Sequence, residues 1–121
     1  MRKIIYQKFI SRHDARMNPS VYYLFGDNFK RQGFGGQAKE LRGEPNAIGV
    51  RTKLYPTMYP NAFFTDDTFD MNCALIDEDL SQLPTDCIVV IPSAGLGTGL
   101  SELPTRAPRT YAWLVNRLKN L

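Results

Sequence analysis

Two glycine-rich stretches contain most of the residues whose types and spacing could do chemistry. FGDNFKRQGFGG, residues 25–36, follows the apolar residues 21–25, and SAGLGTG, residues 93–99, follows the apolar residues 87–92. A glycine-rich turn between a strand and a helix leaves main-chain N–H groups unpaired and facing one point, where an anion can bind. Because open α/β sheets bind ligands at the carboxyl ends of their strands, we predict that the two loops lie side by side. They would then bind one phosphate-bearing, nucleotide-like ligand.

In the first stretch, glycines and two polar residues are the candidates for ligand contact. Gly33, Gly35 and Gly36 permit positive φ angles and a close approach of the main chain to a ligand. Asn28 both donates and accepts hydrogen bonds, so it could recognise ribose hydroxyls or an amide. Asp27 could accept from a ribose hydroxyl or a base amino group, or take a proton. The alternative is a solvated loop whose glycines only form a tight turn.

Basic residues in and after this stretch, Lys39 among them, could neutralise phosphate. Residues 47–53, AIGVRTK, are predicted to form a short strand that ends in polar side chains. Arg51 or Lys53 would point at the ligand, and Thr52 would hydrogen-bond it. The alternative is an exposed edge strand whose charges deter aggregation.

The second stretch alternates glycines with small or apolar residues. Ser93 and Thr98 offer hydroxyls, and successive N–H groups there could form an anion-binding nest. It matches neither a Walker A loop nor a dinucleotide fingerprint, and the alternative is a plain strand–helix connection. Asp27 and Asn28 are the predicted catalytic residues. The predicted ligand-binding residues are Gly26, Gly33, Gly35, Gly36, Gln37, Lys39, Arg51, Thr52, Lys53, Ser93, Gly95, Leu96, Gly97, Thr98 and Gly99.

Length and composition bound the class of protein. At 121 residues, with 43% hydrophobic and 22% charged residues, the chain is expected to form one domain with its own core. No apolar run approaches the roughly 18 residues that span a membrane, and the N-terminus does not read as a signal peptide. We therefore expect a cytoplasmic protein without a membrane partner. One histidine, His13, and two separated cysteines predict no metal site, and nothing predicts a cofactor.

Charge is unevenly distributed. The net charge is +3, but residues 65–86 contain seven acids and no Lys or Arg, so the rest of the chain is strongly basic. A basic surface around the first glycine-rich stretch suits an anionic ligand. It also keeps open a nucleic-acid-binding module, although the basic residues are dispersed and do not suit a groove-reading helix.

The apolar patterns predict a single three-layer α/β domain with a mixed sheet. Residues 11–20 are expected to be a connection, and residues 54–61 a long, proline-containing loop of the kind that is often functional. Asp66 or Asp67 would cap the second helix, whose apolar stripe is Phe69, Cys73, Ile76 and Leu80, with the acids on the other face. The expected strands are residues 3–10, 21–25, 47–53, 62–65 and 87–92, and the expected helices are residues 37–42, one from residue 66, and one with Pro108 in its first turn and a core stripe of Tyr111, Leu114, Val115 and Leu118.

The motifs resemble a family of small bacterial and phage proteins. The shared pattern is a strand ending in FGDN, then GxGGQAK, AIGVRTK and GLGTGL, found here at residues 25–28, 33–39, 47–53 and 95–100. This layout is similar to that of macro domains, which bind ADP-ribose. The resemblance implies Asn28 near the distal ribose, Gly35 and Gly36 beside it, and residues 95–99 on the diphosphate. The macro-type N-A-A-N motif is replaced here by Gly26-Asp27-Asn28.

Three function classes follow. The first is a domain that binds an ADP-ribose-like or signalling nucleotide, either hydrolysing an ADP-ribosyl bond, with Asp27 orienting water, or sequestering a signal during phage infection. The second is a nucleic-acid-binding module. The third is a phage-encoded inhibitor of a host protein. The sequence leaves the ligand's identity and the oligomeric state open.

Overall fold

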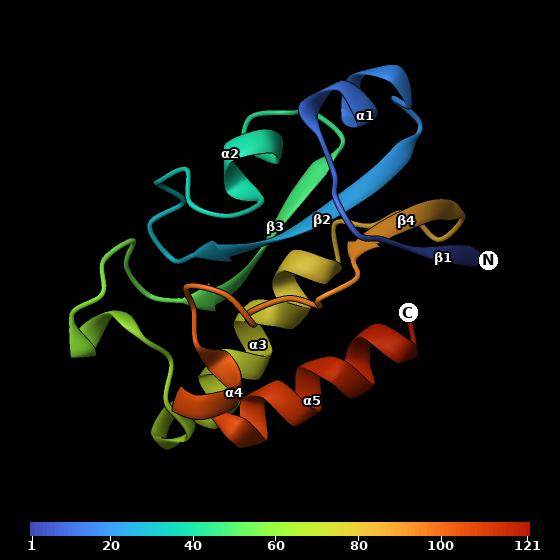
Figure 1. Cartoon of the computed structure of the whole chain (residues 1–121). Helices are drawn as coiled ribbons and strands as arrows, with labels where there is room; N and C mark the ends of the chain where they lie inside the picture. The colour runs from blue at the N-terminus through green and yellow to red at the C-terminus, as the bar shows by residue number, and fades with distance from the viewer.

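A parallel sheet of four strands forms the middle layer of the computed structural model, which describes all 121 residues. The strands are β1 (Arg2–Gln7), β2 (Val21–Asn28), β3 (Ala47–Lys53) and β4 (Cys87–Pro92), in the order β1-β4-β2-β3. Every pair of neighbouring strands is parallel. The loops that follow β2, β3 and β4 therefore gather at one side of the molecule (Figure 1).

Helices cover both faces of this sheet, so the predicted three layers are confirmed (Figure 1). The short helices α1 (Arg12–Met17) and α2 (Ala38–Leu41) lie on one face, over the smaller apolar cluster. On the other face, α3 (Phe69–Leu80), α4 (Leu103–Arg106) and α5 (Pro108–Lys119) pack on the larger cluster. No helix is both long and apolar enough to cross a membrane.

The predicted mixed sheet is wrong, because residues 62–65 form no strand. The only antiparallel pairing is an isolated bridge between Lys53 and Phe63. The preceding residues turn as a 3-10 helix, η1 (Pro60–Ala62), and both Phe63 and Phe64 are buried. Burial of the two successive aromatic side chains draws this segment into the core, and its pairing with β3 is limited to the bridge at Lys53.

Residues 11–20, expected to be a connection, contain α1. Ser11 and Asp14 form a capping box in which each side chain accepts a hydrogen bond from the other's main-chain N–H. Only Ala15 of this helix is buried, so the segment shows almost no apolar periodicity. β1 accordingly ends at Gln7, earlier than the predicted boundary at residue 10.

The second predicted helix begins with a 3-10 turn, η2 (Asp66–Thr68), before α3. Ile76 and Leu80 of the predicted stripe are fully buried, whereas Phe69 and Cys73 are only partly buried. The expectation that the acids face outward fails at one position, because Asp79 is completely buried.

Asp66 caps a different helix from the one expected. Its carboxylate accepts hydrogen bonds from the main-chain N–H groups of Arg109 and Thr110 and from the Thr110 hydroxyl, at the start of α5. α3 itself begins without a side-chain cap. Burial opposes ionisation of Asp66, but these hydrogen bonds outweigh it and lower its pKa below the ordinary value.

This cap predicts a pH dependence of stability. A carboxylate whose pKa is lowered by folding stabilises the protein above its unfolded pKa, about 3.9, and the contribution disappears as the pH falls through the folded pKa. We expect thermal unfolding scans between about pH 5 and pH 2 to show a smaller loss of Tm in Asp66→Asn than in the wild type. Asp67→Asn is the control, and an equal loss of Tm in Asp66→Asn and wild type would contradict the capping role.

Candidate functional site

The two glycine-rich loops line one cavity at the carboxyl ends of β2 and β4. This cavity, called the loop cavity below, has a volume of about 250 Å³. It joins residues 35–36 of the first loop to residues 94–99 of the second, which is the adjacency that the sequence predicted. The residues that line it are Lys8, Gly26, Gly35, Gly36, Gln37, Pro92, Ala94, Gly95, Leu96, Gly97, Thr98, Gly99, Leu100 and Ser101.

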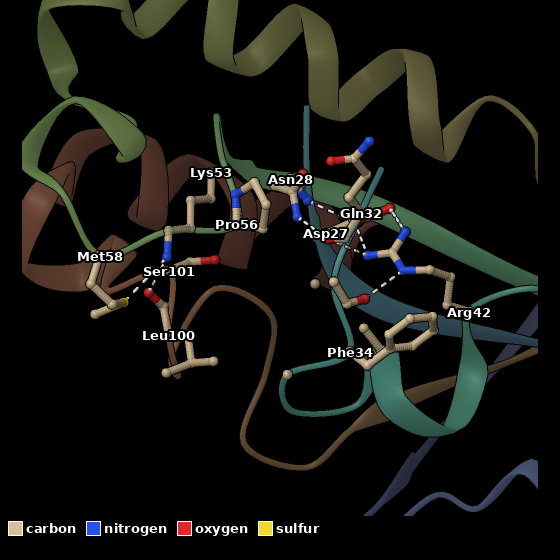
Figure 2. Close-up of a pocket in the computed structure, with 14 residues that line it drawn as sticks. Asp27, Asn28, Gln32, Phe34, Arg42, Lys53, Pro56, Met58, Leu100 and Ser101 are labelled. Atoms are coloured by element: carbon tan, nitrogen blue, oxygen red, sulfur yellow. Dashed lines mark hydrogen bonds and ion pairs between the residues drawn. The ribbon is translucent and has the colours of Figure 1, made fainter. Parts of the chain in front are cut away.

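A second cavity of about 230 Å³, the strand-end cavity, lies beside the first and shares Gly26, Gly35, Leu100 and Ser101 with it. Figure 2 shows its labelled side chains, which come from the ends of β2 and β3, the first glycine-rich loop, the C-cap of α2, the loop after β3 and the loop before α4. The two cavities therefore form one continuous depression. The other residues that line the strand-end cavity are Asp27, Asn28, Gln32, Gly33, Phe34, Ala38, Arg42, Lys53, Pro56 and Met58.

Main-chain N–H groups without a partner in the chain belong to residues of both glycine-rich loops that line this depression. The N–H groups of residues 32–37 and 96–101 have no hydrogen-bond acceptor within the chain, either from the main chain or from a side chain. Leu96 and Gly97 are nevertheless buried residues. Unpaired donors at buried positions cost free energy unless a ligand or water accepts from them, so these amides are available for an anion.

Positive φ angles give these loops their shape. Gly33 and Gly36 in the first loop, and Gly95 and Gly97 in the second, all have φ between 58° and 93°. At Gly97 a side chain would also press against Leu103, only 3.0 Å from the position of a Cβ. Glycine is therefore required at these turns by backbone conformation, and at Gly97 by space as well.

Asn28 and Lys53 are cross-strand partners at the ends of β2 and β3, and both line the strand-end cavity. The Asn28 amide nitrogen donates to the carbonyl of Gln32, but its Oδ1 is buried and accepts no hydrogen bond. The Lys53 Nζ donates to the carbonyl of Leu100 and contacts the Met58 sulfur (Figure 2).

Lys53 has no carboxylate within ion-pair distance, although its side chain is buried and lies over the ring of Phe63. Burial lowers the pKa of Lys53; nearby Glu102 opposes this effect and Arg106 adds to it. An ammonium group without a paired carboxylate at the wall of a cavity favours an anionic or hydrogen-bond-accepting ligand.

Asp27 is fully engaged by the protein. Its carboxylate accepts from Arg42 at 2.5 and 3.2 Å, from Arg31 at 3.1 Å and from the main-chain N–H of Asn28. The Arg42 fork is visible beside Asp27 in Figure 2. The absence of a side chain at Gly49 makes room for this carboxylate, since a Cβ there would overlap Oδ2 of Asp27. Asp27 thus positions Arg42 at the cavity wall.

A second buried carboxylate extends the ion-pair network to α3. Asp79 accepts from Arg31 at 2.5 Å and from the Arg51 side chain at 3.0 Å, and it also receives the Arg51 main-chain N–H. Arg31 therefore joins Asp27 to Asp79, and it does so from a left-handed backbone conformation, φ 55°. The network connects the first glycine-rich loop to the helix on the other face of the sheet.

The structure brings most predicted site residues to the two cavities. Thr52 lies directly beneath them and is fully buried. Its hydroxyl forms a hydrogen bond of 2.7 Å with the hydroxyl of Ser101. Arg51 pairs with Asp79, and neither Lys39 nor Ser93 lines a cavity that joins the two loops. Gln37 lines the loop cavity, but its amide also pairs with both main-chain groups of Ile10.

Several lining residues lie outside the predicted set. Lys8 follows β1, and an all-parallel sheet would have placed it at this edge. Leu100 and Ser101 come directly after the second glycine-rich stretch, and Pro56 and Met58 belong to the loop whose length suggested function. The position of Arg42 depends on its pairing with Asp27 across 15 residues, for which the sequence gives no signal.

One family model, described as a family of unknown function (DUF7831), matches residues 5–117. This match includes the end of β1, the whole of β2, β3 and β4, and both glycine-rich loops, and the chain belongs to this family. No curated protein and no solved structure matches the chain. The similarity to macro domains remains a prediction that rests on the motifs.

The ion-pair network predicts an asymmetry between two neighbouring acids of α3. Asp79→Asn leaves two arginines without a buried counter-charge and should lower the free energy of unfolding by about 3 kcal/mol, measured by urea denaturation. Glu78→Gln is the matched control, because the Glu78 side chain is exposed and its one ion pair is with Arg51, at 3.4 Å. It should cost less than about 0.5 kcal/mol. Equal effects of the two substitutions would contradict the role of Asp79.

Proposed function

We propose that this protein binds a phosphate-bearing nucleotide derivative, with its phosphate in the loop cavity and its nucleoside part in the strand-end cavity. The observation that carries the proposal is the set of unpaired amides in residues 32–37 and 96–101, which border one depression. Successive main-chain donors bind phosphate oxygens without the cost of ordering long side chains. Lys8 adds a positive charge at the loop cavity.

The lining of the strand-end cavity suits a nucleoside. Phe34, Pro56 and Met58 supply apolar surface, while the buried Oδ1 of Asn28 offers an acceptor to a hydroxyl or amino group. Small-molecule sites commonly combine an apolar wall with a few placed polar groups. At about 230 and 250 Å³, the two joined cavities suit a ligand of nucleotide size better than phosphate alone.

The state of Asp27 favours binding over hydrolysis. A carboxylate that orients an attacking water needs a free oxygen within hydrogen-bond reach of it. Both oxygens of Asp27 accept hydrogen bonds from the protein, and its side chain is only 2% exposed. We therefore propose a nucleotide-binding domain that sequesters its ligand, and ADP-ribose, suggested by the resemblance to macro domains, is the first compound to test.

Gly26→Ala tests this site without backbone strain, because Gly26 lies in β2 and its φ is not positive. The added methyl would lie 3.6 Å from the main-chain N of Gly97 and 3.5 Å from the Thr52 hydroxyl, both ordinary contacts. It would cover one amide donor at the junction of the cavities. We expect an unchanged Tm and about a tenfold loss of affinity, equivalent to about 1.4 kcal/mol, in calorimetry with ADP-ribose, NAD and cyclic oligonucleotides. Absence of heat with every compound would refute the proposal.

Two lysines near β1 provide a matched pair. Lys8→Ala removes the cation at the loop cavity and should weaken binding of the phosphate-bearing ligand, by a factor that shrinks as salt is added. Lys3→Ala removes an exposed lysine of β1 that lines neither cavity and should leave affinity unchanged. Equal losses from both substitutions would indicate that only net charge matters.

A further inference from the structure

A third hollow continues the depression beyond the strand-end cavity. It has a volume of about 540 Å³ and shares Gln32 and Pro56 with that cavity. Three hollows therefore follow one another along the same side of the molecule, from Lys8 through Asn28 to the loop after β3. The other residues that line the third hollow are Lys30, Tyr55, Thr57, Tyr59 and Asn61.

Exposed aromatic side chains border this trough. Tyr59 is 72% exposed and Tyr55 38%, both in the third hollow, and Phe34 at the strand-end cavity is 65% exposed. Lys30 lies over the ring of Tyr55, 5.6 Å from its centroid. Aromatic rings beside cations form a stacking platform for nucleobases, each of which presents a π-face to a ring.

The charges along the trough have one sign. Lys8, Lys53 and Lys30 line its three hollows without a paired carboxylate. The only acid among the lining residues is Asp27, which is neutralised by Arg42 and Arg31. The acids of residues 66–86 belong to η2, α3 and the segment that leads to β4. A chain of phosphates would therefore meet attraction along the whole trough.

We propose that the trough binds single-stranded nucleic acid by its phosphorylated end. The terminal phosphate occupies the loop cavity, the first nucleoside occupies the strand-end cavity, and the next base stacks on Tyr55 or Tyr59. This inference rests on the proposed function and specifies the class of its ligand. A mononucleotide would occupy the first two hollows and leave the aromatic platform uncovered. A duplex is disfavoured, because its bases are already stacked on one another.

The experiment is fluorescence anisotropy with oligothymidines about five nucleotides long. One strand carries a 5′-phosphate, one a 3′-phosphate and one neither. The dye is attached to the end opposite the phosphate, and the unphosphorylated strand is labelled at either end in two separate preparations. We expect one of the phosphorylated strands to bind at least tenfold more tightly than both the unphosphorylated strand and thymidine monophosphate. Its affinity should fall steeply as salt is raised. The same strand annealed to its complement should bind more weakly.

Tyr59→Ala should lower the affinity for the phosphorylated strand by about tenfold, which corresponds to the loss of one stacked base. It should leave the affinity for thymidine monophosphate unchanged. The side chain of Tyr59 is exposed, so the fold should tolerate the substitution. Tyr6→Ala is the matched control: Tyr6 is 55% exposed, lies in β1 and lines none of the three hollows, and its substitution should change neither affinity.

The outcomes separate this inference from the proposed function. If mononucleotides or ADP-ribose bind and depend on Gly26, but oligonucleotides bind no better or Tyr59→Ala has no effect, the inference is wrong and the proposed function stands. Tighter binding of the duplex, or equal binding of phosphorylated and unphosphorylated strands, also overturns it. If no nucleotide of any kind binds, both are wrong.

Discussion

The parallel direction of all four strands is the constraint on which the candidate site depends. Because every strand runs the same way, the segments that follow β1, β2, β3 and β4 all begin at one edge of the sheet. Lys8, the two glycine-rich loops and the proline-containing loop are far apart in sequence and meet only for this reason. An antiparallel strand among them would have sent one of these segments to the opposite edge.

The buried carboxylates Asp27 and Asp79 hold the first glycine-rich loop against that edge. Each accepts from two arginines, and Arg31 is shared between them. A residue in a left-handed conformation, such as Arg31, is held there only when its surroundings determine it. The network therefore restricts the conformation of a polar loop and fixes the positions of its main-chain amides. Buried ion pairs add little net stability against apolar substitutes, and here they fix a conformation.

Sequence patterns predicted the parts of this protein that repeat a local rule. β3 and β4 have their predicted bounds, and the two glycine-rich loops meet as expected, because apolar runs and glycine turns are local signals. The features that the sequence did not predict mostly depend on contacts between residues that are distant in the chain. The helical pattern predicts that Asp79 faces outward with the other acids of α3. It is buried because it pairs with Arg31 and Arg51, which are distant in the sequence. α1 carried a local signal, the Ser11–Asp14 capping box, that its polar composition obscured.

A site made mostly of main-chain donors limits what such a protein can recognise by itself. If the proposed function holds, the amides of residues 32–37 and 96–101 would bind any phosphate of suitable size, so they would supply affinity and little discrimination. Discrimination must come from the side chains around them, which here are an unpaired carboxamide oxygen on Asn28, an ammonium group on Lys53 and exposed aromatic rings. The Asn28 oxygen would favour ligands with a hydroxyl or amino donor, and the aromatic rings would favour ligands with more than one base. Ligand choice should therefore respond to substitutions at Asn28 and Tyr59, whereas substitutions at the glycines should weaken all phosphate-bearing ligands alike.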